Sequence, residues 1–129
     1  MKDSSIGSRV ALAAFTYDFA VHGGTAGAII VGAGRLPAGA IIFDGLIHVV
    51  TAIEGTTSTL AISVMSANDL LTATAEASLT VGLLTDVVPD GTAANAIKVT
   101  SPKGCTFTIG TNDLTAGKVV VNLRYFDTT

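Results

Sequence analysis

Two histidines, His22 and His48, are the only ones in the chain, and each has an aspartate nearby in sequence, Asp18 and Asp44 respectively. Imidazole and carboxylate groups together can bind a metal ion or transfer a proton. A zinc site requires three or four protein ligands at suitable positions, and the spacing here supplies no further ligand. No loop of alternating acidic residues of the calcium-binding type is present either. We therefore predict structural or loop roles for both histidines and no metal site.

The other residues that could carry chemistry are one cysteine and one glycine pair. Cys105 lacks an activating base beside it, although Lys103 is two residues away, and we expect a buried, unreactive thiol. Gly32-Ala33-Gly34 is similar to the start of a dinucleotide-binding loop, but Pro37 and a strand follow where that loop requires a helix. The Gly-x-Ser-x-Gly motif of serine hydrolases is missing. We predict no catalytic, cofactor-binding or metal-binding residues, and hence no enzyme.

The composition indicates a protein that hides much of its surface in an assembly. Of the 129 residues, 49% are hydrophobic and only 13% are charged, whereas about 25% of a soluble chain is usually charged. A membrane helix requires about 20 consecutive apolar residues, and the most apolar stretch, residues 36–50, is interrupted by a proline, two glycines and Asp44. We expect no membrane partner.

The remaining bulk features concern the compartment and the partners. The sequence starts with polar residues and lacks the apolar core of a secretory signal. A single cysteine allows no internal disulfide, which is typical of proteins made in a reducing cytoplasm. The net charge is −3, and no basic patch suited to phosphates is evident. We expect no nucleic-acid partner.

The periodicity is that of β-strands. Residues 10–19, 59–65 and 106–109 divide into two alternating sets, as the two faces of a strand require, and residues 119–126 are assigned to the last strand. Residues 40–50 are rich in Ile and Val, with a bulge or kink predicted at Asp44-Gly45. Residues 28–31 and 79–88 are also assigned to strands, whereas residues 68–77 permit a helical turn but argue against a long helix. Turns or connections are predicted at residues 22–25, 32–39, 89–92 and 115–118.

Eight or nine short strands at regular spacing predict an all-β fold. We expect a single-domain antiparallel β-sandwich, jelly-roll-like, over residues 9–129, preceded by a flexible N-terminal arm at residues 1–8. The aromatic residues of the first and last strands (Tyr17, Phe19, Tyr125 and Phe126) are assigned to the core.

Charge is unevenly distributed along the chain. Between Leu36 and Ile97 there is no Lys or Arg, although six acidic residues lie in that span: Asp44, Glu54, Asp69, Glu76, Asp86 and Asp90. One interpretation is that loops carry charge for solubility. The other is that oppositely charged patches meet across a subunit contact and select the partner and its register.

Three stretches resemble small structural proteins of tailed bacteriophages. They are Thr16-Tyr17-Asp18-Phe19-Ala20-Val21-His22-Gly23-Gly24, Leu36-Pro37-Ala38-Gly39-Ala40-Ile41-Ile42, and Leu114-Thr115-Ala116-Gly117-Lys118-Val119 with Arg124-Tyr125 beyond it. Their order and spacing extend the resemblance over nearly the whole chain. At one position this sequence departs from those proteins, because it has His22 where an acidic residue is expected.

This resemblance implies a virion protein, made in the host bacterial cytoplasm, that decorates and cements the capsid surface against the major capsid protein. It implies no catalytic residues. The shortage of charge also predicts self-association, as a homotrimer first and a dimer second. A head-fibre or neck/tail module is the alternative structural role. A carbohydrate-binding β-sandwich is an alternative of another class, but such modules usually present exposed aromatics and this chain has no Trp.

Overall fold

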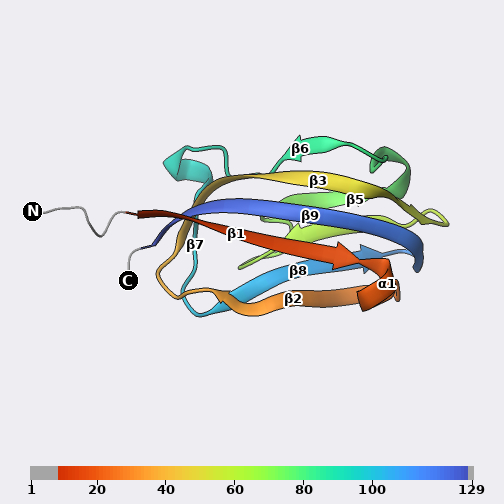
Figure 1. Ribbon diagram of the computed structural model, residues 1–129, viewed down its shortest axis with the longest axis horizontal. Helices are drawn as coiled ribbons and strands as arrows, with labels where there is room; N and C mark the ends of the chain where they lie inside the picture. The colour runs from red at the N-terminus through yellow and green to blue at the C-terminus, as the bar shows by residue number, and fades with distance from the viewer. Residues whose placement is uncertain (1–8, 128–129) are drawn as a thin grey trace, which may run out of the picture.

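The fold is a two-layer antiparallel β-sandwich (Figure 1). The computed structural model describes residues 9–127, and the predicted arm at residues 1–8 lies outside them. Within the described part, nine strands form the two sheets. The all-β sandwich predicted from the sequence is therefore confirmed, and the domain boundary at residue 9 stays a prediction.

The strands are short, with two longer ones that cross the first sheet. The elements in chain order are β1 (Arg9–Asp18), α1 (Phe19–His22), β2 (Gly27–Leu36), β3 (Ile41–Gly55), β4 (Thr59–Ser63), β5 (Leu71–Ala75), η1 (Glu76–Ser78), β6 (Leu84–Asp86), η2 (Ala93–Asn95), β7 (Ile97–Lys98), β8 (Lys103–Gly110) and β9 (Leu114–Asp127). None of the helical turns described is long enough to cross a membrane.

The strand order is that of a jelly roll. The first sheet runs β1-β9-β3-β6, with β7 also paired to β3, and the second runs β2-β8-β4-β5. The pairings are nested, because β1 pairs with β9, β2 with β8 and β4 with β5. Such nesting describes an antiparallel ribbon rolled into two layers. It also places the free edges of β1 and β2 on one flank of the sandwich, and β5 and β6 on the other.

The core lies between the sheets and follows the alternation of each strand. In β1, Ala13, Phe15 and Tyr17 are buried, while Leu12 and Ala14 are exposed. The Tyr17 ring lies 5.7 Å from that of Phe107 in the second sheet. Its hydroxyl donates to the carbonyl of Gly23, 2.5 Å away, so the polar tip of this buried ring is satisfied. Each large buried side chain contributes about 1.5–3 kcal/mol.

Two glycines allow β3 to lie close to β9. A Cβ on Gly45 would lie 2.5 Å from the backbone oxygen of Asn122, and the register between the two strands shifts just before it, between Ile42 and Asp44. The predicted bulge at Asp44-Gly45 is thus confirmed. Gly117 has a φ of +143°, and a Cβ there would lie 2.4 Å from Cδ1 of Ile53.

Several boundaries differ from the sequence-based predictions. Residues 115–118 form no turn but continue β9 back to Leu114, and β2 runs on to Leu36 through a bulge instead of ending at Val31. Residues 79–88 are mostly irregular, since only Leu84–Asp86 is a strand. Residues 71–75, where the sequence left a helical turn open, form β5. For β9 and β2, pairing with a strand distant in sequence outweighed the local turn signal, as expected when β-propensity depends on neighbours.

Candidate functional site

The outer face of the first sheet carries large apolar side chains that nothing in the described chain covers. Cross-strand register places Leu12 beside Arg124 and Asp44 in one row. The next row holds Ala14, Asn122, Leu46 and Asp86. Leu12 is 75% exposed and Leu46 is 38% exposed. Apolar residues that gather on one face of a small protein typically mark an interaction surface.

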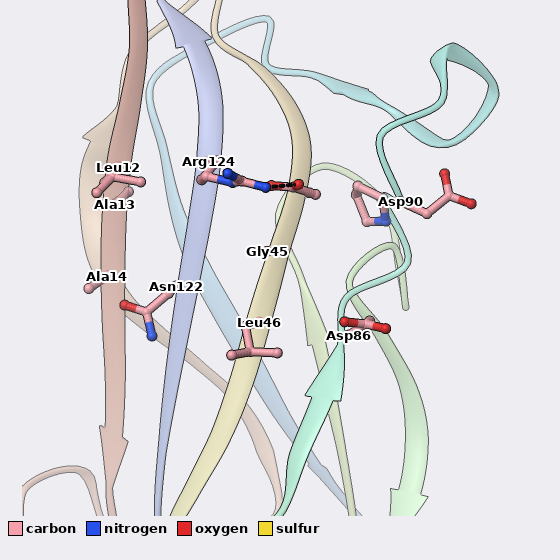
Figure 2. Close-up of a pocket in the computed structure, with 11 residues that line it drawn as sticks. Leu12, Ala13, Ala14, Gly45, Leu46, Asp86, Asp90, Asn122 and Arg124 are labelled. Carbon is pink, nitrogen blue, oxygen red and sulfur yellow. Dashed lines mark hydrogen bonds and ion pairs between the residues drawn. The ribbon is translucent and has the colours of Figure 1, made fainter.

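A groove of about 870 Å³ crosses this face. Figure 2 shows Leu12 and Ala14 along β1 on one side, Asn122 and Leu46 on the floor, and the segment after β6 on the other side. That far wall carries Asp86, Pro89 and Asp90. The volume lies within the range of small-molecule sites, and the lining combines an apolar wall along β1 with an acidic wall on the other side.

An ion pair lies across the groove between β9 and β3. Nε of Arg124 donates to Asp44 at 2.7 Å, and a second nitrogen of the same guanidinium contacts the other carboxylate oxygen. The hydrogen bond that Arg124 donates to Asp44, followed by the charge of that carboxylate, raises the pKa of Arg124 above its ordinary value. The guanidinium carbon also lies 5.5 Å from the centre of the Phe43 ring, which stacks on Phe126. The pair neutralises Asp44 and fixes its position.

The acidic wall stays charged. Asp90 accepts from the Thr92 hydroxyl at 2.7 Å and from its backbone N–H at 3.2 Å. These hydrogen bonds lower the pKa of Asp90, so the carboxylate is ionised at neutral pH. Asp86 is exposed at the end of β6. With Asp44 neutralised by Arg124, the groove presents excess negative charge opposite the apolar side chains of β1, an arrangement suited to recognition.

The structure gives the candidate histidines and aspartates structural contacts. His22 accepts a hydrogen bond through Nδ1 from the backbone N–H of Asp18, whose side chain in turn caps α1 at the N–H of Ala20. His48 lies in β3 opposite Leu84, and Asp44 pairs with Arg124 rather than with a histidine. Among residues 9–127, no three His, Cys, Asp or Glu side chains are grouped as metal ligands would be.

The cysteine and the glycine pair also have structural roles, one in the core and the other at a β-bulge. Cys105 is buried, and burial, with a smaller contribution from the charge of Asp69, raises the pKa of its thiol to about 12. The expected burial is confirmed. Gly32 and Gly34 lie at the bulge of β2 and open no helix. Of the aromatic residues assigned to the core, Tyr17 and Tyr125 are buried, but Phe126 is 38% exposed.

Sequence reasoning did not single out Leu12, Leu46, Asp86 or Arg124 as a site. The available signal was a lone charge inside an otherwise apolar strand, at Asp44 and at Arg124. Such a charge usually lies on the exposed face of a sheet. That signal does not reveal which two strands are neighbours, and so it could not pair these residues.

Three solved structures contain chains of the same fold. A chain of the cyanophage Pam1 capsid asymmetric unit is 21% identical, with a TM-score of 0.67, over 98% of this chain and 90% of that chain. A chain of the acidic stable capsid of Helicobacter pylori bacteriophage KHP30 is 19% identical, with a TM-score of 0.65, over 96% and 92%. A chain of the capsid of Ralstonia phage GP4 is 18% identical, with a TM-score of 0.68, over 96% and 88%.

Since each alignment covers most of both chains, the neighbours have about the length of this protein. At these identities the similarity establishes the shared fold. No protein-family model matches the sequence, and a search of curated proteins finds no similar sequence.

Proposed function

We propose that this protein is a structural component of a tailed-bacteriophage virion, which decorates the capsid surface and cements neighbouring subunits. The observation that carries the proposal is the full-length fold similarity to chains of three phage capsids. The resemblance of its sequence motifs to phage structural proteins supports the same role. The groove, which lacks a nucleophile paired with a base, supports binding rather than catalysis.

The outer face of the first sheet is the surface proposed to contact the major capsid protein. Leu12 and Leu46 supply apolar area, worth about 25 cal/mol per Å² buried before the costs of association. The Arg124–Asp44 pair enters such a contact already neutralised, which lowers the cost of removing it from water. Many copies on one shell multiply a modest contact.

The copies are proposed to associate with one another, as a trimer first and a dimer second. A head-fibre or neck/tail role remains the alternative in the same structural class. The carbohydrate-binding alternative gains no support, because no aromatic side chain lines the groove within the described residues.

Two experiments test the capsid role. Mass spectrometry of purified virions should find this chain in many copies per particle. In a second experiment, purified protein is added to shells that lack it, and binding is measured by co-sedimentation. Leu12→Asp should weaken binding at least tenfold, while Val21→Asp on α1 should not. The pair is matched, because Leu12 is 75% exposed and Val21 is 74% exposed.

Light scattering on both variants checks that their self-association equals that of the wild-type protein. Absence of the chain from virions would contradict the capsid role. Equal binding by the two variants would show that the groove face is not the contact surface.

A further inference from the structure

The charges of the sandwich separate onto its two flanks. The flank formed by β5, β6 and their connections, here called the acidic flank, consists of residues 66–96 and contains Asp69, Glu76, Asp86 and Asp90 without any Lys or Arg. Asp69 is engaged by backbone N–H groups, whereas Asp86 and Asp90 are exposed. Figure 1 shows β6 at one border of the first sheet, with β1 at the other.

The opposite flank is formed by the free edges of β1 and β2 and is here called the basic flank. Arg35 lies between the two edges, exposed, and donates to the backbone oxygen of Ala14 while its guanidinium carbon lies 5.2 Å from the Phe15 ring centre. Lys103 starts β8 beside Leu36 of β2. Asp18, the acid at the end of β1, already caps α1.

Both flanks also expose large apolar side chains. The acidic flank has Val81 at 69%, Leu84 at 59% and Val88 at 44% exposure. On the basic flank, Val10 of β1 is 52% exposed and Ile30 of β2 is 64% exposed. Monomeric proteins usually blunt free strand edges with charge or cover them. Residues 10–17 of β1 and 27–34 of β2 carry no charged side chain, so these edges are protected by charge only where Arg35 reaches the backbone oxygen of Ala14.

We propose that the two flanks are the two halves of one contact, in which the acidic flank of one copy of this chain docks on the basic flank of the next. The acidic flank offers Asp86 and Asp90 beside its apolar side chains, and the basic flank offers Arg35 beside its own. Because the contacting surfaces differ, the contact is heterologous, and its repetition produces a closed ring if the rotation between successive copies closes and an open chain if it does not. The trimer expected from the sequence is a ring of this kind.

The same charges disfavour the pairing of like flanks. A two-fold contact through the acidic flank would place Asp86 and Asp90 of one copy opposite the same carboxylates of another, and like charges that meet across an interface cost several kcal/mol. The second copy is the favoured occupant because the chain itself carries both complementary surfaces. In this proposal, the uneven distribution of charge along the sequence selects how the copies contact one another.

Charge reversal tests the proposal on the purified protein. One variant combines Asp86→Lys with Asp90→Lys, a second carries Arg35→Glu, and a third combines all three substitutions. Analytical ultracentrifugation at low salt should give the wild-type protein as a ring of 13.0 kDa chains. The first two variants should dissociate at least tenfold more readily, and the third should recover the wild-type assembly because each contact again joins opposite charges.

A matched control separates the flank from charge in general. Glu54→Lys makes the same kind of reversal at an exposed residue near the end of β3, outside both flanks, and should leave the assembly unchanged. Circular dichroism and melting verify folding. If Arg35→Glu fails to fold, Ile30→Glu replaces it, because this substitution also adds a negative charge to β2. The combined variant then carries Ile30→Glu together with the two aspartate substitutions.

A wild-type monomer at tens of micromolar would overturn the proposal. So would an assembly that survives both single-flank reversals, or a folded combined variant that stays dissociated. These results concern the isolated protein, and therefore leave the virion role to be decided on virions and shells.

Discussion

Asp69 should be among the most important polar residues for stability, because its carboxylate organises the connection between β4 and β5. It accepts hydrogen bonds from three consecutive backbone N–H groups, those of Val64, Met65 and Ser66, at 2.8–2.9 Å. Leu70 then donates to the carbonyl of Ile62 and starts the return toward β5. Asp69→Ala removes the carboxylate that accepts these three hydrogen bonds, so the three backbone N–H groups of this partly buried connection lose their acceptor.

The expected loss follows from the number of bonds. A net contribution of about 1 kcal/mol per hydrogen bond gives about 3 kcal/mol for Asp69→Ala. For a chain of this length, about 4 °C of melting temperature corresponds to 1 kcal/mol, so the midpoint should fall by about 12 °C. Asp113 provides the control, because its carboxylate accepts a single bond, from the N–H of Ala26 at 2.8 Å. Asp113→Ala should cost about 1 kcal/mol.

Thermal and urea unfolding, followed by circular dichroism, measure both variants. Asp69→Asn, which keeps the shape of the side chain but replaces one acceptor oxygen with a donor, should fall between Asp69→Ala and the wild-type protein. The reasoning is refuted if Asp69→Ala and Asp113→Ala lose equal stability, because the difference in bond number would then have no effect.

Three further predictions concern the core and the absence of a metal. Since the pKa of the buried Cys105 thiol is raised from 9.0 to about 12, thiol reagents at pH 8 should label the folded protein about 1,000-fold more slowly than the unfolded chain. Because the folded state favours the protonated thiol, the free energy of unfolding should be constant below about pH 9 and fall toward pH 12. Cys105→Ala should reduce that fall. Rapid labelling at pH 8 would contradict the buried position. Gly117→Ala should cost about 2–3 kcal/mol, since its Cβ would lie 2.4 Å from Cδ1 of Ile53, whereas Gly91→Ala, which has positive φ but open space around it, should cost about 1 kcal/mol in urea unfolding; equal losses would mean that the clash is relieved. Treatment with a chelator should leave the melting temperature unchanged, and a drop of several degrees would reveal a structural metal.

The sequence by itself determined the class of the fold. Alternation in residues 10–19 identified the buried face of β1, and the structure buries Ala13, Phe15 and Tyr17 as that period requires. The turn residues between strands limited strand length and hence favoured a sandwich. The shortage of charged residues, and the missing partners for His22, His48 and Cys105, pointed to assembly rather than catalysis. These features are local or compositional, so the order of residues is enough to reveal them.

The tertiary structure alone decided which strands are neighbours, and therefore where the groove and the flanks lie. β1 pairs with β9, so that Arg9 stands opposite Asp127, and β3 pairs with β9, so that Asp44 meets Arg124. A period of two specifies only the two faces of a strand. It carries no information on which distant strand lies beside it, because that choice depends on the packing of the whole core. The same limit explains why residues 115–118 resembled a turn although β3 holds them in β9 as a strand.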